Sequence, residues 1–529
     1  MHLLKSPCDE AFAETRKAAS TECGKAQRRW TLAATILGSS MVFIDGTVVN
    51  VALPVLQRKL SANVTDVQWV IEVYTLFLAA LLLLGGSLGD RFGRKKIYAI
   101  GVVVFALASV WCGLAPNISQ LILARAAQGV GGALLVPGSL AIISATFTEK
   151  DRGKAIGTWS GATAMTTALG PVLGGWLIEH VTWRAVFFLN VPLALAVLGL
   201  LVLFVPESRD EKDSGRVDLF GAGLATLGLG GLVFGLIESS RLGFSNPLVI
   251  ATMCGGIIMS AAFIVVEARV RNPMMPLQLF RSRNFAGANL LTLFLYAALA
   301  GTLFFFPLNL IQVQGYSATA AGAASLPFIL IMFGLSRWSG GLVKRYGARL
   351  PLVVGPVIAA IGLGLFVRPE VGRSYWTTFF PAVVVLGLGM AISVAPLTTT
   401  VMNSVSENRA GIASGINNAV SRTAGLLAIA VLGLVMFHAF NACLDDGLSR
   451  AALPPSIRQA LDDQRIRLAA VELPADADGA TRTHVKQLVN ECFLHGFRWV
   501  MLCGAGLALG SSVTSLLLLE RQTRKRTAN

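Results

Sequence analysis

The sequence is poor in charged residues and in cysteine. Charged residues make up 14% of the 529 positions and hydrophobic residues 54%, whereas a soluble globular protein carries about 25% charged residues. This composition excludes a soluble domain and indicates an integral membrane protein. The seven cysteines form no CxxC pair and no Cys/His spacing of the kind that binds zinc, so the sequence predicts no metal site.

The signatures of several functional classes are also missing. No Walker lysine motif is present, so we expect no ATP hydrolysis by this chain. No nucleophile–base pair or metal constellation points to a membrane enzyme. Residues 1–29 are polar and charged, without the apolar core of a cleavable signal peptide. We therefore expect a membrane protein that is not an enzyme and that needs no cofactor.

Apolar stretches of roughly 20 residues, long enough to cross a bilayer, recur along the chain. They predict an all-α fold with about fourteen transmembrane helices. The expected spans are 31–53, 67–89, 97–115, 119–146, 154–178, 184–205, 217–237, 247–267, 286–310, 319–343, 350–368, 375–403, 410–437 and 497–520.

The chain also repeats itself. The sequence GSLGDRFG at 86–93 is echoed by GGLVKRYG at 340–347, each at the end of the second helix of a six-helix set. Parallel repeats of this kind build transporters whose site lies between two halves. The predicted domains are a tail (1–29), an N-terminal six-helix bundle (30–206), a linker with two inserted helices (207–285), a C-terminal six-helix bundle (286–520, with a long loop at 438–496) and a second tail (521–529).

Basic residues set the expected orientation. Lys and Arg gather at 25–29, 91–96, 269–283 and 521–526, which fall on one side of the membrane if the number of helices is even. The positive-inside rule makes that side cytoplasmic. The sequence therefore predicts a multi-pass protein of the cytoplasmic (inner) membrane with both termini inside. This placement of the basic residues accounts for the net charge of +15, so we expect no nucleic-acid partner.

Asp45 lies within the first apolar run, which begins near Trp30 and ends at Pro54. An unpaired carboxylate at the centre of a membrane helix costs at least about 2.5 kcal/mol. Such a residue usually has a functional role, most simply binding a proton or a cation. The alternative is a carboxylate that a neighbouring helix neutralises for packing alone.

The loop after the second helix reads GSLGDRFGRKK. Its glycines allow a tight turn between two helices, while the acid and the basic cluster can lock a cytoplasmic gate through ion pairs. The residues concerned are Gly86, Gly89, Asp90, Arg91, Gly93 and Arg94. This stretch resembles the signature of the major facilitator superfamily. A loop that only sets topology would need neither the acid nor fixed glycines.

Two further stretches resemble motifs of that superfamily. In LILARAAQGVGG, Arg125 and Gln128 match the fourth-helix motif, whose arginine the resemblance assigns to proton coupling. A guanidinium stays charged, so Arg125 needs an acid partner or water; packing in the core is the alternative. Helix five resembles the antiporter motif of exporters, although one glycine of the extended pattern is replaced by Thr166. The matching residues are Gly157, Gly170, Pro171, Gly174 and Gly175. A plain small-residue packing face is the other reading of this helix.

The chain from about residue 30 to 520 resembles the fourteen-span drug:proton antiporter family. The resemblance rests on FIDGTVVNVALP (43–54), WRAVFFLNVP (183–192), VDLFG (217–221), FRSRNF (280–285), QVQGYS (312–317) and ASGINN (413–418). It implies that Asp45 handles protons or cations, and it places Arg422 at a basic position of helix thirteen. Glu72 departs from the neutral residue expected there. Glu72 is either a second carboxylate for protons or cationic substrates, or a solvated residue near the surface.

Large polar and aromatic side chains on the central helices are candidates for lining a substrate cavity. They are Asn50, Tyr74, Gln128, Asn289, Asn309, Gln312 and Asn417. In the predicted long loop, 456–470 has charged and apolar residues at helical spacing, which suggests an interfacial helix. Cys443 and Cys492 flank this loop on the oxidising side of the membrane, where they form either a disulfide or two free thiols.

The predicted function is proton-coupled efflux of drugs or other toxic amphiphilic or cationic compounds by alternating access, driven by the proton gradient. The expected partners are a small-molecule substrate, protons and the lipid bilayer; a periplasmic adaptor is left open. The alternative is an exporter of one endogenous metabolite or self-made antibiotic that works by the same mechanism. A membrane receptor that transports nothing is the third hypothesis, and the antiporter motif speaks against it.

Overall fold

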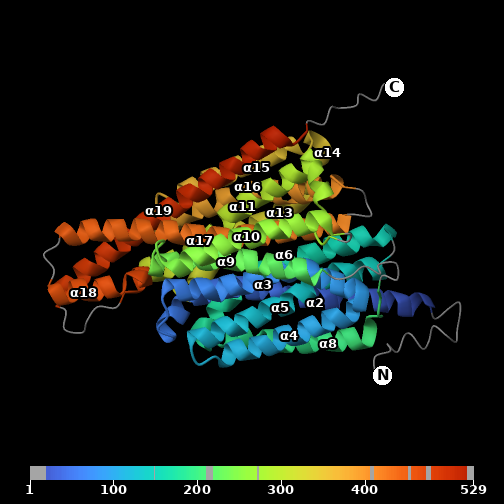
Figure 1. Cartoon of the computed structure of the whole chain (residues 1–529), viewed down its shortest axis with the longest axis horizontal. Coiled ribbons are helices and arrows are strands. Elements are labelled where there is room, and N and C mark those ends of the chain that lie inside the picture. Colours follow the sequence, from blue (N-terminus) through green and yellow to red (C-terminus); the bar gives the residue numbers. More distant parts are fainter. Residues whose placement is uncertain are drawn as a thin grey trace. The chain divides into compact units, whose positions relative to one another are not determined.

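The structure is a computed structural model of the whole chain, and the residues it describes are 20–147, 149–209, 218–270, 273–405, 410–450, 454–471 and 478–520. The outer part of the N-terminal tail, the C-terminal tail and most of the linker 207–217 lie outside the described residues. Figure 1 shows that the described chain is built from helices.

The described residues of the first half of the chain form nine helices. They are α2 (Ser20–Lys59), α3 (Val64–Phe92), α4 (Arg94–Leu114), α5 (Ile118–Thr146), α6 (Glu149–His180), α7 (Ala185–Phe188), α8 (Asn190–Phe204), α9 (Leu219–Leu242) and α10 (Pro247–Arg269). The α4 helix begins at the glycine-containing loop, and α5 begins where the Asn117 side chain accepts a hydrogen bond from the backbone of Gln120.

The second half is also helical. Its elements are the 3₁₀ helix η1 (Leu277–Arg281), α11 (Arg283–Leu308), the π-helical turn η2 (Asn309–Val313), α12 (Ala318–Ala323), α13 (Leu326–Gly340), α14 (Leu342–Tyr346), α15 (Arg349–Leu365), α16 (Tyr375–Asn403), α17 (Ala410–Arg450), α18 (Pro455–Asp463), the 3₁₀ helix η4 (Arg465–Ala470) and α19 (Gly479–Leu518).

The helices agree with the predicted all-α membrane fold. Twelve of them are long and apolar enough to cross a membrane, among the residues that the structure describes. The α15 helix is apolar but shorter, and α6 covers the remaining predicted span. Every predicted span therefore falls on a helix, although the count of fourteen remains approximate.

The chain forms two compact units. Unit 1 consists of Met1–Ala52, Trp69–Gly230 and Gly256–Met275, and unit 2 consists of Leu53–Gln68, Gly231–Gly255 and Pro276–Asn529. Each unit has an apolar core of its own. In unit 1, Tyr98 and Phe105 of α4 are fully buried among residues of α2, α3, α5 and α8. In unit 2, Phe306, Phe366 and Phe379 contact one another ring to ring.

The predicted end of helix thirteen and start of helix fourteen are wrong. The segment 438–496 was expected to be a long loop, but α17 continues to Arg450 and α19 already begins at Gly479. Hydropathy marks only the apolar part of a helix, whereas these two helices continue with polar surfaces. Between them lie α18 and η4; α18 confirms a helix in the first part of 456–470, which ends at Asp463, while its predicted position at the membrane interface stays a prediction. In Figure 1 this part lies at one end of unit 2.

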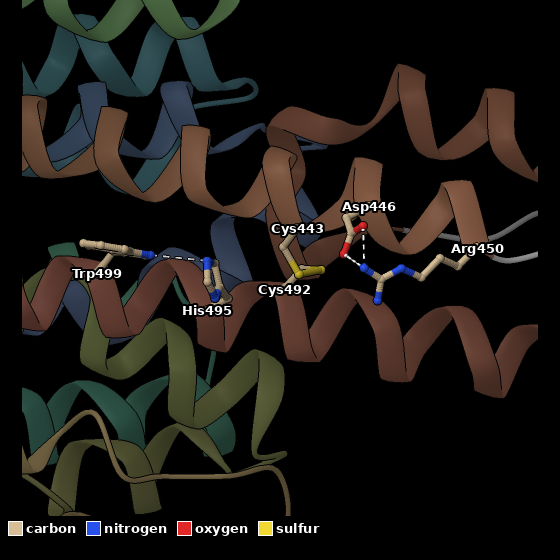
Figure 2. Close-up of a disulfide and its surroundings, with 6 residues drawn as sticks. All are labelled: Cys443, Asp446, Arg450, Cys492, His495 and Trp499. Carbon is tan, nitrogen blue, oxygen red and sulfur yellow. Dashed lines mark hydrogen bonds and ion pairs between the residues drawn. A yellow bond between two sulfur atoms is a disulfide. The ribbon is translucent and has the colours of Figure 1, made fainter.

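A disulfide joins the polar ends of α17 and α19. Cys443 is bonded to Cys492, with 49 residues of separation in the sequence, so of the two alternatives left open by the sequence the structure contains the disulfide. Figure 2 shows this bond beside the Asp446–Arg450 ion pair of α17. On the α19 side, Trp499 Nε1 donates a hydrogen bond to His495 Nε2 at 3.2 Å. The disulfide therefore links α17 and α19, which run side by side.

Candidate functional site

The candidate site is built around Asp45, in the middle of α2. Its side chain is 0% exposed, although a carboxylate is among the most costly groups to bury in a membrane helix. Helix α2 continues through this position because the flanking residues are apolar and the next proline is at Pro54. The cost of burial has to be offset by the groups that surround the carboxylate.

Three side chains from two other elements donate hydrogen bonds to the Asp45 carboxylate. Arg125 Nη1 of α5 donates to Oδ2 and forms an ion pair with it. One turn further along the same helix, Gln128 Nε2 donates to Oδ1 at 2.8 Å. Asn190 Nδ2, at the start of α8, donates to Oδ1 at 3.2 Å. Both oxygens of the carboxylate are thus satisfied.

Arg125 is held from several directions. Its Nε donates to the carbonyl oxygen of Val70 at 3.0 Å, and its Nη1 also donates to Gln128 Oε1 at 2.7 Å. The guanidinium lies over the ring of Tyr74, with its central carbon 4.1 Å from the ring centroid, a cation–π contact that adds to its stabilisation. The structure thereby supplies the acid partner that the sequence requires for Arg125.

Sequence reasoning missed two members of this cluster. Ser109 Oγ of α4 accepts hydrogen bonds from Gln128 Nε2 at 2.7 Å and from Asn190 Nδ2 at 3.1 Å. Asn190 is 1% exposed. Its signal was present in the sequence, since an amide inside the apolar run FFLNVPLALAV requires a buried polar partner. A serine in an apolar helix carries no comparable signal.

Glu72 lies on α3, the helix that also carries Tyr74. Its side chain is 0% exposed, and neither carboxylate oxygen has a hydrogen-bond partner among the residues that the structure describes. The solvated surface position considered from the sequence is therefore wrong. Burial of a carboxyl group without a hydrogen-bond donor is costly, and a role for Glu72 in carrying protons stays a prediction.

The antiporter motif of α6 packs against α2 next to Asp45. A Cβ atom added to Gly170 would collide with Thr47 Oγ1, and one added to Gly174 would collide with Val48. Thr47 Oγ1 also donates to the Thr167 carbonyl at 3.2 Å, so the two backbones approach closely. Pro171 lies within α6, and Gly175 is buried. Gly157 differs, because it is exposed and has nothing within 4 Å of its added Cβ.

The predicted gate residues lie where α3 passes into α4. Gly93 has a φ of +108° and could not be replaced without strain. Asp90 pairs with Arg94 at 2.8 Å, while the guanidinium of Arg91 lies over the ring of Phe92. Gly86 and Gly89 are helical, and an added Cβ there would make only ordinary contacts. The predicted ion pair of Asp90 with the basic cluster is therefore present.

A residue without a predicted role completes this loop. Glu207, three residues beyond α8, accepts hydrogen bonds from the backbone N–H groups of Lys95 and Lys96 at 3.0 and 3.1 Å. These are first-turn donors of α4, which have no partner within the helix. The carboxylate therefore caps α4 at its start.

The candidate cavity residues of unit 2 form two groups. Asn417 Nδ2 of α17 donates to Asn289 Oδ1 at 3.1 Å and to Thr292 Oγ1 at 2.7 Å, both on α11. Separately, Gln312 Nε2 donates to Gln57 Oε1 at 2.6 Å.

Three other candidates stand apart from these groups. Asn309 is 0% exposed, and no described residue pairs with its side chain. Arg422 lies within α17 and is half-buried, and Asn50 bonds only weakly to its own helix at 3.5 Å. Substrate contact by Asn309 and Asn50, and proton coupling by Arg422, stay predictions.

The chain is similar to known transporters over most of its length. Residues 35–429 match the family described as Major Facilitator Superfamily. The chain is 36% identical over 484 residues to the multidrug resistance protein Stp of Mycobacterium tuberculosis, covering 89% of this chain and 88% of Stp. It is 32% identical over 505 residues to the tetracenomycin C resistance and export protein of Streptomyces glaucescens, covering 94% of this chain and 93% of that protein.

The fold is similar to that of a solved transporter. The inward-facing, unoccupied crystal structure of a bacterial homologue of the human lysosomal transporter Spinster matches with a TM-score of 0.65 at 20% identity, covering 93% of this chain and 98% of that one. At this identity the likeness concerns the fold alone, and it confirms the predicted fold class.

Proposed function

Because the chain belongs to the major facilitator superfamily, and is therefore a transporter and not an enzyme, we propose that it exports drugs or other toxic compounds in exchange for protons. The observation that carries the proposal is the buried Asp45–Arg125 ion pair. The names of the similar proteins, which include a multidrug resistance protein and an antibiotic export protein, support the direction of transport. Within the superfamily we assign the chain to the fourteen-span drug:proton antiporters.

The cluster suits a proton switch. With Asp45 ionised, its carboxylate accepts from Arg125, Gln128 and Asn190. A proton on Oδ2 would neutralise the carboxylate and remove the attraction for Arg125. The guanidinium would keep its bonds to the Val70 carbonyl and to Gln128 Oε1, so a released Arg125 would still have partners.

Loss of the Asp45–Arg125 ion pair would also affect the packing of α2 against α6. Asp45 lies two residues before Thr47, whose side chain contacts α6 at Gly170 and Thr167. A small shift of α2 after loss of the ion pair would therefore alter the tightest part of the α2–α6 contact. Close-packed interfaces respond to such shifts by moving between discrete arrangements, as alternating access requires. Glu72 is the second candidate for carrying a proton.

The expected setting is the cytoplasmic (inner) membrane, with both termini inside. Protons would then enter the site from the outer side and leave to the cytoplasm while the substrate moves outward. Buried carboxylates at Asp45 and Glu72 favour cationic or amphiphilic substrates. The positive charges of Arg125 and Arg422 are also compatible with anionic substrates. No ATP or bound cofactor enters this cycle.

A second candidate function has its own support. The similarity to a protein named for tetracenomycin C resistance and export favours export of a single self-made antibiotic or other metabolite by the same mechanism. Export of one compound with no effect on unrelated dyes would select this alternative over multidrug export.

The test is dye efflux and proton movement in everted membrane vesicles. Asp45→Asn keeps the size of the side chain but cannot be ionised, so we expect proton-coupled efflux to be abolished. Asp446→Asn serves as the matched control, since it removes an exposed carboxylate that also pairs with an arginine, and it should transport normally. Proton-driven efflux retained by Asp45→Asn would reject Asp45 as the coupling acid.

A further inference from the structure

The side-chain amide of Asn190 uses only one of its two ends in the Asp45 cluster. Its Nδ2 donates to Asp45 Oδ1 at 3.2 Å and to Ser109 Oγ at 3.1 Å. Its Oδ1 is buried and has no hydrogen-bond partner among the residues that the structure describes. Asn190 is 1% exposed, and a buried carbonyl oxygen that lacks a donor is costly. Such an oxygen requires an explanation.

The other amide of the cluster has no such defect. Gln128 Nε2 donates to Asp45 Oδ1 and to Ser109 Oγ. Its Oε1 accepts from Arg125 Nη1 at 2.7 Å and from the Cys112 thiol at 3.6 Å. Turning this amide over would place its oxygen against the carboxylate and its NH₂ group against the guanidinium. Gln128 is therefore fixed in one orientation and serves Asp45 only as a donor.

Asn190 is not fixed in this way. The two orientations of an amide group have nearly the same shape, so a half turn about the Cβ–Cγ bond exchanges Oδ1 and Nδ2 with little change in packing. The oxygen would then stand where Nδ2 is now, within hydrogen-bond distance of Asp45 Oδ1 and Ser109 Oγ. The end that faces away from Asp45 has no described partner. The groups on the Asp45 side therefore decide between the two orientations.

The protonation state of Asp45 determines that choice. An ionised carboxylate only accepts hydrogen bonds, whereas a protonated carboxyl group has an O–H that needs an acceptor. Of the three side chains that bond to Asp45, Arg125 can only donate, and the Gln128 oxygen is already occupied. Asn190 Oδ1 is the acceptor that remains. A proton taken up on Asp45 Oδ2 reaches the Asn190 side when the neutral carboxyl group, released from Arg125, turns over.

We propose that Asn190 is the positioning residue for the protonated state of Asp45: its amide turns over when Asp45 takes up a proton, and Oδ1 accepts the carboxyl O–H. Asn190 then stabilises both states, as a donor to the ionised form and as an acceptor for the neutral one. Ser109 permits the change because a hydroxyl group can donate as well as accept. The inference rests on the proposed role of Asp45 in proton coupling.

The other titratable groups near Asp45 come from three helices. Cys112 of α4 and Arg125 of α5 interact with it electrostatically, and Tyr74 of α3 lies under the guanidinium. Glu72, also on α3, is buried. The described contacts of this part of α2 with α6 and α8 are made by uncharged residues. A pH-dependent signal must therefore be assigned to Asp45 by substitution.

The test is infrared difference spectroscopy, acid minus neutral, on the full chain in lipid vesicles, with asparagine isotope-labelled at its side-chain carbonyl. Protonation of Asp45 should give a carboxyl C=O band together with a downward shift of one labelled amide C=O band, because Asn190 Oδ1 gains a donor. An amide that kept its present orientation would gain none. Asn190→Leu should keep the carboxyl band and lose the amide shift, whereas Asp45→Asn should lose both.

Transport gives a second measurement. Efflux by Asn190→Leu should fall about tenfold, as expected for loss of one hydrogen bond to an ionisable group. Asn441→Leu is the matched control, because Asn441 Oδ1 on α17 also lacks a described partner but belongs to unit 2. This variant should transport normally and keep both infrared signals.

The outcomes separate the inference from the function on which it rests. An Asp45 carboxyl band without a downward amide shift, or an amide shift that Asn190→Leu retains, would overturn the inference and leave the proposed function intact. Wild-type efflux by Asn190→Leu would overturn it as well. Absence of an Asp45 carboxyl band at every pH would reject both the inference and the role of Asp45 in proton coupling.

Discussion

The Asp45 carboxylate and the Arg125 guanidinium form an ion pair in which the two side chains are 0% and 1% exposed. The pair joins α2 to α5 inside unit 1. In a buried pair, desolvation of the two charges offsets much of their attraction. The net contribution of the intact pair to stability is therefore small, although each charge requires the other as its partner.

Removing one partner of this pair should be costly. Arg125→Met leaves Asp45 buried without its counter-ion, and we expect the free energy of unfolding to fall by about 3–5 kcal/mol. Asp45→Asn in the same chain should restore part of that loss, because the uncompensated charge is gone. Unfolding in mixed detergent micelles measures both effects.

The control for this prediction is an exposed pair. Arg450→Met breaks the bond to Asp446, whose side chain is 58% exposed, and should change stability by about 0–1 kcal/mol. Equal stability of Arg125→Met and the wild type would contradict a charge-paired Asp45.

The glycines of α6 should differ sharply in their tolerance of a methyl group. Gly170→Ala forces a Cβ against Thr47 Oγ1 and within 3.2 Å of the Ile44 carbonyl oxygen. We expect it to cost about 1–3 kcal/mol of stability and to impair efflux. Gly157→Ala meets nothing within 4 Å and should behave as the wild type. Similar transport rates for the two variants would show that the α2–α6 contact is not required for transport.

Loss of the disulfide should destabilise the polar ends of α17 and α19. Replacing Cys443 and Cys492 by serine opens a loop of 49 residues, for which loop-closure entropy gives about 4 kcal/mol. We expect faster hydrogen exchange in α18 and in the adjoining turns of both helices. Cys254→Ser, at an exposed thiol of α10, is the control. Mass analysis of the non-reduced wild type that finds both thiols free would contradict the bond.

The membrane spans could be predicted because apolar length and basic loops are properties of short stretches of sequence. The ends of α17 and α19 could not, because a helix that leaves an apolar setting keeps its backbone bonds while its surface turns polar. Only pairing with another helix, here through Cys443 and Cys492, stabilises such an extension. Hydropathy does not detect that pairing.

The candidate site was predictable in part. Asp45 and Arg125 stand out because each is a charge within an apolar run, yet nothing in the sequence says that they meet. Ser109 and Asn190 join them only through the fold, since 81 residues separate the two along the chain. Gly157 shows the opposite case, because its place in the motif suggested a helix contact, yet no described residue lies within 4 Å of a Cβ atom added there.

The position of Glu207 has a mechanical consequence. Its carboxylate binds the first backbone N–H groups of α4, and the Ser208 carbonyl accepts from the Arg94 N–H at 2.8 Å. The turn after α3 and the start of the linker towards α9 are thus fastened together by three bonds. Any displacement of that turn must therefore either carry Glu207 and Ser208 with it or break these three bonds.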